Sequence, residues 1–431
     1  MEYSYKINVC IIGAGPAGLV CAFHLAKFNI QTLLIDKSEF PRNKVCGDGI
    51  TMKAIHELAR INLDFEKKIL KDSNTLPSYG IDIISPEQRQ FNVFSQLKKN
   101  HEITVLVKKR EIFDYNLLEE VRKQKEIIFL SSIKVLNYIK VDGAYLIKAV
   151  HNSKEVTIYT NLIIDAQGAY SVFVRQHLKL KQYNNNSCIG VRGYFERKKP
   201  SKNNTIELYF LKELLPGYFW IFDLPNGIAN VGYGTTIKNF NSLKTNYKIL
   251  YHQLIENYPL ISERIYSDKI IGGIQTHLLP VRRRNNLFSG ENFLLTGDAA
   301  SLIDPFTGEG ISNASISGRI AAQIAKFAVA NNDYSARFLK QYDNLINEEI
   351  GKELRSSFKL RRFLKYPKLL DYIFKNADKS RSCKNIISAM FVDFENRKTV
   401  RPVIWYLISP KFLFYRLKQW TERNKFEPVG M

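Results

Sequence analysis

The stretch Ile7-Asn-Val-Cys-Ile-Ile-Gly-Ala-Gly-Pro-Ala-Gly-Leu19 decides the fold, because an apolar strand runs directly into a G-x-G-x-x-G turn. Gly13, Gly15 and Gly18 hold the three glycine positions, and a mostly apolar helical pattern follows as far as Lys27. In a strand–helix–strand unit these glycines permit a tight turn, a close approach of backbone to a pyrophosphate, and close packing of helix on strand. The glycine pattern alone is a weak signal.

The next apolar run, Gln31-Thr-Leu-Leu-Ile-Asp36, strengthens it. Asp36 lies 18 residues after Gly18, close to the spacing of about 20 at which a carboxylate holds the ribose hydroxyls of a dinucleotide. A signal peptide or membrane span is the competing interpretation, and three glycines, a proline and interior polar residues argue against it. We therefore predict a dinucleotide site with these contact residues: Gly13, Ala14, Gly15, Pro16, Ala17, Gly18, Asp36 and Lys37.

A second glycine-punctuated segment lies far along the chain, from Leu294 to Gly310. An apolar strand there ends on Gly297-Asp298, which brings the carboxylate to the sheet edge where ligands of open α/β sheets bind. Glycines before a helix let backbone amides approach an electron-rich ring or a phosphate. An ordinary capped turn explains this segment equally well when it is taken alone. Paired with the first motif, it predicts a flavin site built from Gly297, Asp298, Pro305, Gly308 and Gly310.

Length and composition fit a cofactor-binding enzyme of two or three structural units. The chain has 431 residues, 45% of them hydrophobic, which supports a substantial core. The five cysteines are scattered without C-x-x-C pairing, so we expect a reducing cytoplasm and no structural metal. Neither a basic leader nor a long uncharged apolar run is present, so neither secretion nor membrane spanning is indicated.

The net charge of +22 is concentrated toward the C-terminus. Residues 351–431 contain 19 Lys and Arg against 7 Asp and Glu, interleaved with aromatic residues, as at 361–370 and 403–417. That mixture suits peripheral contact with an anionic membrane surface. Compositional drift with solvated basic helix faces is the alternative. We expect no nucleic-acid partner, because no binding motif is present.

Strand and helix patterns predict an α/β fold. A hairpin is expected at 79–94, an antiparallel insertion of short strands at 127–130, 134–138, 144–149 and 156–159, and a buried strand at 162–165. Strand-rich runs from Cys188 to Gly234 and two helices should follow. The predicted units are a discontinuous Rossmann-like FAD-binding domain (1–75, 100–180 and 285–350), an antiparallel-sheet substrate domain (76–99 and 181–284) and a basic helical C-terminal region (351–431).

Together the motifs resemble the flavoprotein monooxygenase superfamily and, within it, the geranylgeranyl reductase family, over most of residues 5–330. The resemblance implies that the first glycine turn and Asp36 hold the adenosine part of FAD. It implies that Asp298 meets the ribityl and pyrophosphate region, while the following helix start faces the flavin. It also implies an FAD contact for Arg110 in Arg110-x-x-Phe113-Asp114, where a surface arginine at a helix start is the alternative.

Two further motifs resemble the reductase branch. Pro41-x-x-Lys44-x-Cys46-Gly47-Asp48-Gly49 is similar to a cysteine–glycine loop beside the flavin, and Tyr218-Phe-Trp220-Ile-Phe222 is similar to an aromatic strand over it. An aromatic wall suits a polyprenyl chain, although core packing and loop filling also explain these residues. Two positions depart from the family: Asp223 replaces a proline, and Gln167 replaces an aspartate in a motif associated with FAD and NAD(P)H handling. The second departure argues against direct nicotinamide docking.

The predicted activity is hydride transfer from reduced FAD to a carbon–carbon double bond of an isoprenoid or other lipid-like substrate. NAD(P)H or a reduced ferredoxin-like protein would supply electrons. The candidate catalytic residues are Cys46, Asp48 and Tyr218 as proton donors, with Trp220 in the pocket wall. A flavin-dependent halogenase, an aromatic or polyketide monooxygenase and a non-catalytic lipid-binding flavoprotein remain alternatives. The expected location is the cytoplasm or the cytoplasmic face of a membrane, and no oligomeric state is indicated.

Overall fold

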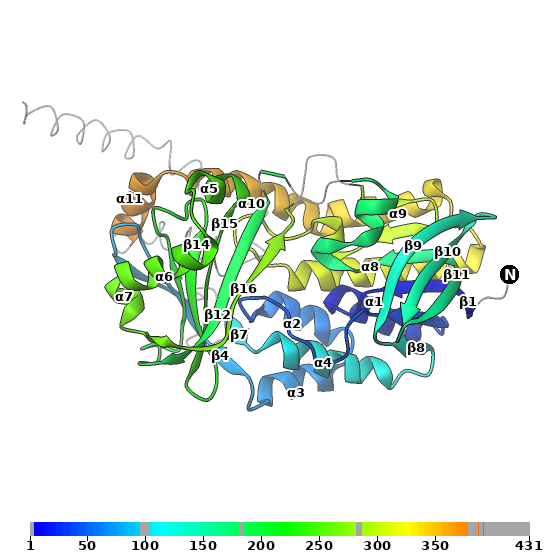
Figure 1. The fold of residues 1–431 in the computed structure, drawn as a ribbon, viewed down its shortest axis with the longest axis horizontal. Helices are drawn as coiled ribbons and strands as arrows, with labels where there is room; N and C mark the ends of the chain where they lie inside the picture. The colour runs from blue at the N-terminus through cyan, green and yellow to red at the C-terminus, as the bar shows by residue number, and fades with distance from the viewer. Residues whose placement is uncertain are drawn as a thin grey trace, which may run out of the picture.

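The computed structural model describes residues 4–94, 103–180, 184–185, 187–281, 287–377, 387 and 391. Two sheet-based units lie side by side along the long axis of the molecule (Figure 1). Of the predicted C-terminal region, the stretch 403–417 lies outside the described residues. No helix in the described ranges is long and apolar enough to cross a membrane.

The first unit is built on an eight-stranded sheet. Its order is β17-β18-β11-β1-β2-β8, and β10 and β9 continue from β11 as antiparallel neighbours. Val9–Ile12 are buried and pair in parallel on both sides, with β11 and β2, as expected for a strand covered on both faces. The strands are β1 (Tyr5–Ile12), β2 (Thr32–Ile35), β8 (Ile127–Leu130), β9 (Ile133–Val141), β10 (Ala144–His151), β11 (Lys154–Asp165), β17 (Ser289–Gly290) and β18 (Phe293–Leu295).

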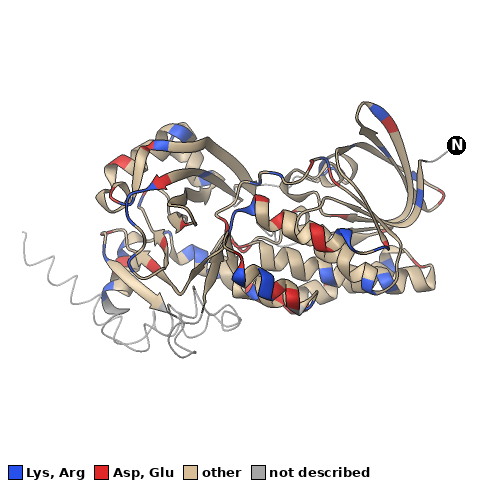
Figure 2. Ribbon diagram, turned by 90° about the horizontal axis from the view of Figure 1, so that it is seen from below, with Lys and Arg blue, Asp and Glu red and all other residues tan. Residues whose placement is uncertain are grey.

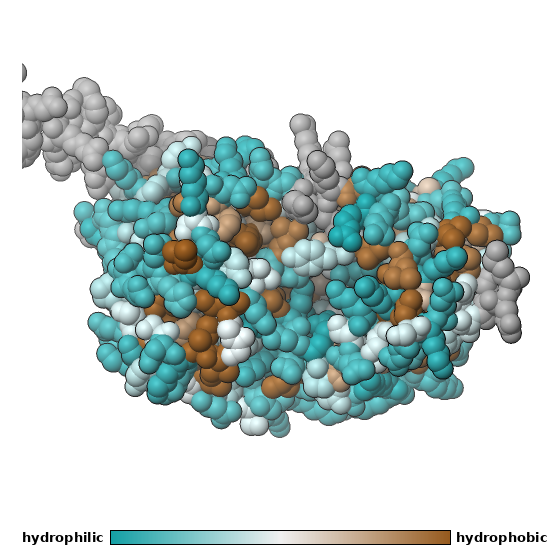
Figure 3. All heavy atoms as spheres, viewed as in Figure 1, coloured by the Kyte–Doolittle hydropathy of each residue, from teal (hydrophilic) through white to brown (hydrophobic). Residues whose placement is uncertain are grey.

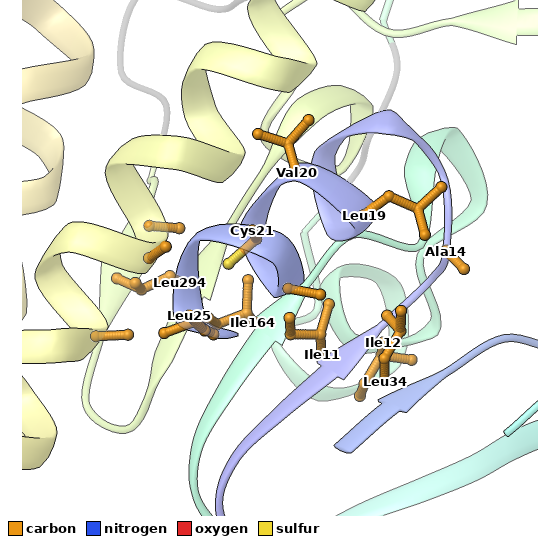
Figure 4. Close-up of a cluster of buried hydrophobic side chains, with 14 of the residues drawn as sticks. Ile11, Ile12, Ala14, Leu19, Val20, Cys21, Leu25, Leu34, Ile164 and Leu294 are labelled. Carbon is orange, nitrogen blue, oxygen red and sulfur yellow. The ribbon is translucent and has the colours of Figure 1, made fainter. Parts of the chain in front are cut away.

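Helices α1 (Pro16–Lys27) and α8 (Ile311–Asn331) pack against each other over this sheet. Proline at the first position of α1 is favourable, since that N–H has no partner inside the helix. Figure 4 places Cys21 and Leu25 of α1 beside Ile164 and Leu294 of the sheet, in one buried cluster. Helix α4 (Arg110–Arg122) packs on α1 and β8, and α9 (Ala336–Ile346) packs on α8 and β17.

The second unit is a seven-stranded sheet in the order β16-β12-β15-β14-β13-β5-β6. All neighbours are antiparallel except β13 and β5. One face packs on α6 through a separate buried cluster. The strands are β5 (Gly80–Ile84), β6 (Gln90–Phe94), β12 (Cys188–Arg197), β13 (Ile206–Tyr209), β14 (Tyr218–Asp223), β15 (Ile228–Thr236) and β16 (Ile265–Leu279).

A small sheet and further helices complete the molecule. The small sheet has the order β3-β7-β4. The inner sides of α10 and α11 pack against the cluster that contains Trp220 and Phe222. The remaining elements are β3 (Gly49–Thr51), β4 (Leu76–Ser78), β7 (Val105–Val107), α2 (Met52–Ala59), α3 (Leu63–Lys71), α5 (Ile237–Ser242), α6 (Tyr247–Asn257), α7 (Pro259–Ser262), α10 (Lys352–Phe363) and α11 (Pro367–Ala377).

Basic and acidic residues are interspersed over both units (Figure 2), and on the face drawn in Figure 3 hydrophobic residues form small separate patches. Helix α10 is different. Its exposed residues are all cationic, and their spacing of three or four places them on one side of the helix, whereas Glu353 is buried. We call this the α10 basic face; it consists of Lys352, Arg355, Lys359 and Arg362.

The predicted α/β class with a Rossmann-like parallel sheet is confirmed, but three strand predictions were wrong. Residues 127–130 are not in the antiparallel insertion: they form β8, a parallel edge strand beside β2, because a short apolar run does not indicate its partner. Residues 156–159 and 162–165 are one strand, β11, since Thr160 and Asn161 stay extended inside it. Strand β16 was missed, and three helices rather than two precede it; as a largely exposed edge strand it lacks a clear apolar pattern.

Candidate functional site

One cavity of about 870 Å³ is lined by both units. Its walls come from the two glycine segments, from the loop between β2 and β3, and from the facing side of the seven-stranded sheet. The two predicted cofactor motifs and the predicted aromatic strand therefore meet at one site.

The first glycine turn forms the dinucleotide end of the cavity. Gly13 has a φ of +109°, and a Cβ there would lie 2.3 Å from the carbonyl oxygen of Ala166, so the turn presses on the end of β11. At Gly15 the atom nearest to an added Cβ is Nη2 of Arg42 at 3.8 Å, so this side is open. The Asp36 carboxylate accepts a hydrogen bond of 2.7 Å from the N–H of Ala14. A cradle kept open by glycine, with an acid on the next strand, fits the pyrophosphate and ribose of FAD.

The predicted contacts in this turn divide into two groups. Six of them line the cavity: Gly13, Gly15, Pro16, Ala17, Asp36 and Lys37. Ala14 and Gly18 do not. Gly18 serves packing, because a Cβ there would lie 1.9 Å from the Gly13 carbonyl oxygen.

The second glycine segment lies across the cavity, and all five of its predicted residues line the wall. Asp304, which was not predicted, shapes the turn: its carboxylate accepts hydrogen bonds of 2.9 Å from the N–H groups of Phe306 and Thr307. Glu309, one residue before the N-cap of α8, accepts a hydrogen bond of 2.7 Å from the N–H of Ser312. Desolvation raises the pKa of Asp298, and the positive charges of Lys44 and Arg110 oppose that shift.

Arg110 is buried at the start of α4 and lines the cavity, so it is not a surface arginine. Its Nε and Nη2 donate to the two carboxylate oxygens of Asp114 at 2.9 and 2.8 Å. Its pKa is raised despite burial, because the charge of Asp114 and its hydrogen bonds favour the guanidinium. Arg110 is thereby held rigidly beside the loop that carries Cys46.

Asp48 requires a correction. It was predicted as a proton donor, but its side chain is fully buried and does not line the cavity. Its carboxylate accepts from the Tyr194 hydroxyl at 2.7 Å, from Nδ2 of Asn230 at 2.8 Å and from the N–H of Arg110 at 3.1 Å. Burial raises its pKa and these hydrogen bonds lower it. Asp48 therefore fixes the loop to β12, β15 and α4.

The aromatic strand β14 alternates between two environments. Tyr218, Trp220 and Phe222 line the cavity, while Phe219 and Ile221 belong to the core cluster behind the sheet. Trp220 donates from Nε1 to Oδ1 of Asn230 at 2.9 Å, and the Tyr218 hydroxyl donates to the carbonyl of Thr307. The polar groups of Tyr218 and Trp220 are thus both hydrogen-bonded, which fixes the two rings. Cys46 lines the same cavity.

Several cavity residues were missed by the sequence analysis. Lys44, quoted within a motif but given no role, contacts Nε2 of His277 through its Nζ at 2.7 Å. Burial lowers the pKa of Lys44, and burial with the charges of Lys44 and Arg110 lowers that of His277 to about 3, so the imidazole is neutral. Arg192, on β12, is also buried against the cavity. No motif marks His277 or Arg192, because their strands are joined to the site by sheet pairing alone.

Comparisons with known proteins agree with this geometry. A family model described as FAD binding domain matches residues 6–345. The digeranylgeranylglycerophospholipid reductase of Picrophilus torridus is 30% identical over 363 residues, covering 83% of this chain and 87% of the relative.

Solved structures give the same result for the fold. A geranylgeranyl bacteriochlorophyll reductase-like protein from Thermoplasma acidophilum has a TM-score of 0.78 at 25% identity, over 96% of this chain and 99% of that one. A flavin-dependent brominase has a TM-score of 0.71 at 18% identity, over 97% of this chain and all of the other, and shares the fold alone.

Proposed function

We propose that this chain, which belongs to the geranylgeranyl reductase family of FAD-dependent oxidoreductases, reduces carbon–carbon double bonds of an isoprenoid lipid. The observation that carries the proposal is the position of the aromatic wall of β14. It lines the same cavity as the two glycine segments and is apolar where a prenyl chain needs no polar partner. Each buried CH₂ of such a chain gains about 0.8 kcal/mol.

Reduced FAD, when bound, supplies the hydride for the double bond. The chain's own residues bind and orient. The first glycine turn with Asp36 would hold the adenosine and pyrophosphate, and the segment from Gly297 to Gly310 would hold the ribityl and ring region. The aromatic wall excludes water from the prenyl chain.

A proton must also reach the second carbon, and we propose the Cys46 thiol as its donor. Asp48 is turned away into its own hydrogen bonds, and the Tyr218 hydroxyl already donates to a backbone carbonyl. Cys46 lines the cavity next to the wall. The electrons come from an external donor, NAD(P)H or a reduced ferredoxin-like protein.

The test is anaerobic. The FAD-loaded protein is reduced chemically, a prenyl lipid is added, and reoxidation of the flavin is followed by absorbance. Reoxidation with formation of the saturated product supports the reductase. If oxygen alone reoxidises the flavin, giving hydroxylated or halogenated products, the proposal is wrong.

We further propose that the protein docks on the cytoplasmic surface of an anionic membrane through the α10 basic face. Four exposed cations on one side of the helix support this, at about 1 kcal/mol per Lys or Arg near such a surface. The inner side of α10 packs against the cluster containing Trp220 and Phe222, so docking would bring the substrate cavity close to the lipid.

A further inference from the structure

Arg192 is a buried cation that keeps an unsatisfied hydrogen-bond donor. Its side chain is 2% exposed and lines the cavity. Nη2 donates to the neutral Oδ1 of Asn43 at 2.6 Å, whereas Nε has no hydrogen-bond partner. Among the described residues no carboxylate forms an ion pair with this guanidinium. A buried charge left in this state is costly, so the site favours an anionic ligand.

The guanidinium is also held in place. It lies over the Tyr194 ring, 4.2 Å from the ring centroid, and Tyr194 is fixed by its hydrogen bond to Asp48. Burial raises the pKa of Asp48 and the charge of Arg192 opposes that shift, but the hydrogen bonds to this carboxylate come from Tyr194, Asn230 and a backbone N–H and not from the guanidinium. Asp48 therefore holds Tyr194 in place beneath Arg192 and takes none of the donors of the guanidinium.

The sheet around Arg192 changes from apolar to polar across the cavity. On β13 and β14 the lining residues are apolar or aromatic, with Leu208, Trp220 and Phe222 among them. On β12 and β16 they include Arg192 and His277. Gly190 of β12, two residues before Arg192, pairs with Gly234 of β15, and both line the cavity. The surface matches a molecule with an apolar chain and an anionic end.

We propose that Arg192 and Asn43 form a subsite for the phosphate group of an anionic prenyl lipid, whose chain extends toward the β14 aromatic wall. The prenyl part of this inference rests on the proposed function. The phosphate part rests on the unpaired guanidinium. Arginine suits this task, because its planar fork of donors matches phosphate oxygens.

The test measures binding to the oxidised, FAD-loaded protein, followed by perturbation of the flavin absorbance. Two ligands share a chain and differ at the head: geranylgeranyl phosphate and geranylgeraniol. Wild type should bind the phosphate more tightly. Arg192→Gln should weaken phosphate binding by about 10-fold to 100-fold, as expected for hydrogen bonds to a charged group, and leave the alcohol unchanged. Arg192→Lys should retain part of the preference.

Lys269→Gln is the matched control. It removes one positive charge from β16 at a side chain that is 50% exposed and paired with Glu196, away from the cavity. It should change neither affinity. FAD content and thermal unfolding of each variant are measured in parallel, and calorimetry tests whether inorganic phosphate alone binds the FAD-loaded protein.

Each remaining outcome is decisive. Equal weakening of both ligands in Arg192→Gln, or a loss of FAD affinity instead, would overturn the subsite. Equal affinity of wild type for both ligands would also overturn it and leave the proposed function standing. Binding of neither prenyl compound would refute the proposed function, and the anion subsite would then hold only if Arg192→Gln abolished binding of inorganic phosphate.

Discussion

Two neighbouring glycines should respond to the same substitution in opposite ways. In Gly13→Ala the new Cβ would lie 2.3 Å from a backbone carbonyl oxygen and would need about 1 Å of movement to reach ordinary contact. The φ of +109° adds backbone strain. Strain and overpacking cost about 1–3 kcal/mol each, so we expect a loss of about 2–6 kcal/mol in the free energy of unfolding. That is a large share of the 5–15 kcal/mol of a typical domain.

Gly15→Ala should behave differently. Its φ of −84° suits alanine, and the nearest atom to the added Cβ is 3.8 Å away. Since Gly15 is the N-cap of α1, where alanine is disfavoured, stability should fall by no more than about 1 kcal/mol. The added methyl projects into the cavity, where backbone must approach the pyrophosphate, so the dissociation constant of FAD should rise by about tenfold or more.

Urea unfolding of the flavin-free proteins measures the first quantity, and fluorescence titration with FAD measures the second. The reasoning would be refuted if Gly13→Ala unfolded at the wild-type urea concentration. It would fail equally if Gly15→Ala lost as much stability as Gly13→Ala while keeping its FAD affinity.

Three further predictions follow from the site and the surface. Cys46→Ala should lower the rate of alkene reduction about 100-fold without changing FAD content, as expected when a proton donor is removed, and full activity in this variant would exclude Cys46 from that role. Burial raises the pKa of Asp165 to about 6, so the folded state holds this proton more tightly than the unfolded chain and the free energy of unfolding should fall as pH rises from about 4 to 6. The drop is about 3 kcal/mol at most, and it should be absent in Asp165→Asn when urea unfolding is followed across this pH range. Changing all four residues of the α10 basic face to Gln should lower the affinity for phosphatidylglycerol vesicles, measured by cosedimentation, by about two to three powers of ten and leave binding to neutral vesicles unchanged. An unchanged affinity for the anionic vesicles would show that this surface does not dock on the membrane.

The sequence alone predicted those parts of the site that depend on residues close together in the chain. The spacing of neighbouring residues was enough to predict three cofactor-site features, because tight turns and helix starts are short-range structures. These are the Gly13–Gly18 turn, the acid on the following strand and the Gly297–Asp298 segment. The α/β class followed from them. The same is true of β14, whose alternation places every second residue on one face.

Long-range pairing could not be obtained in this way. Strand β16 reaches the site through its register with β12, which pairs Gly190 with His277. The residues around His277 contain no pattern that predicts this pairing. Arg192 was overlooked for the same reason. The role of Asp48 was misjudged because a carboxylate in a motif looks catalytic until its donors are known, and those donors come from positions 110, 194 and 230.

The three donors to Asp48 explain how two separate sheets make one site. They come from α4 of the first unit and from β12 and β15 of the second, while Asp48 itself lies on the loop that presents Cys46. One of these partners, Asn230, also donates to the Cys46 carbonyl and accepts from Trp220. The cysteine loop, the aromatic wall and the Tyr194 ring beneath Arg192 are therefore positioned by one buried network. The three donors offset the desolvation cost of the buried Asp48 carboxylate. Replacing Asp48 should then disturb the position of all three features together, which is the expected behaviour of a positioning residue and not of a proton donor.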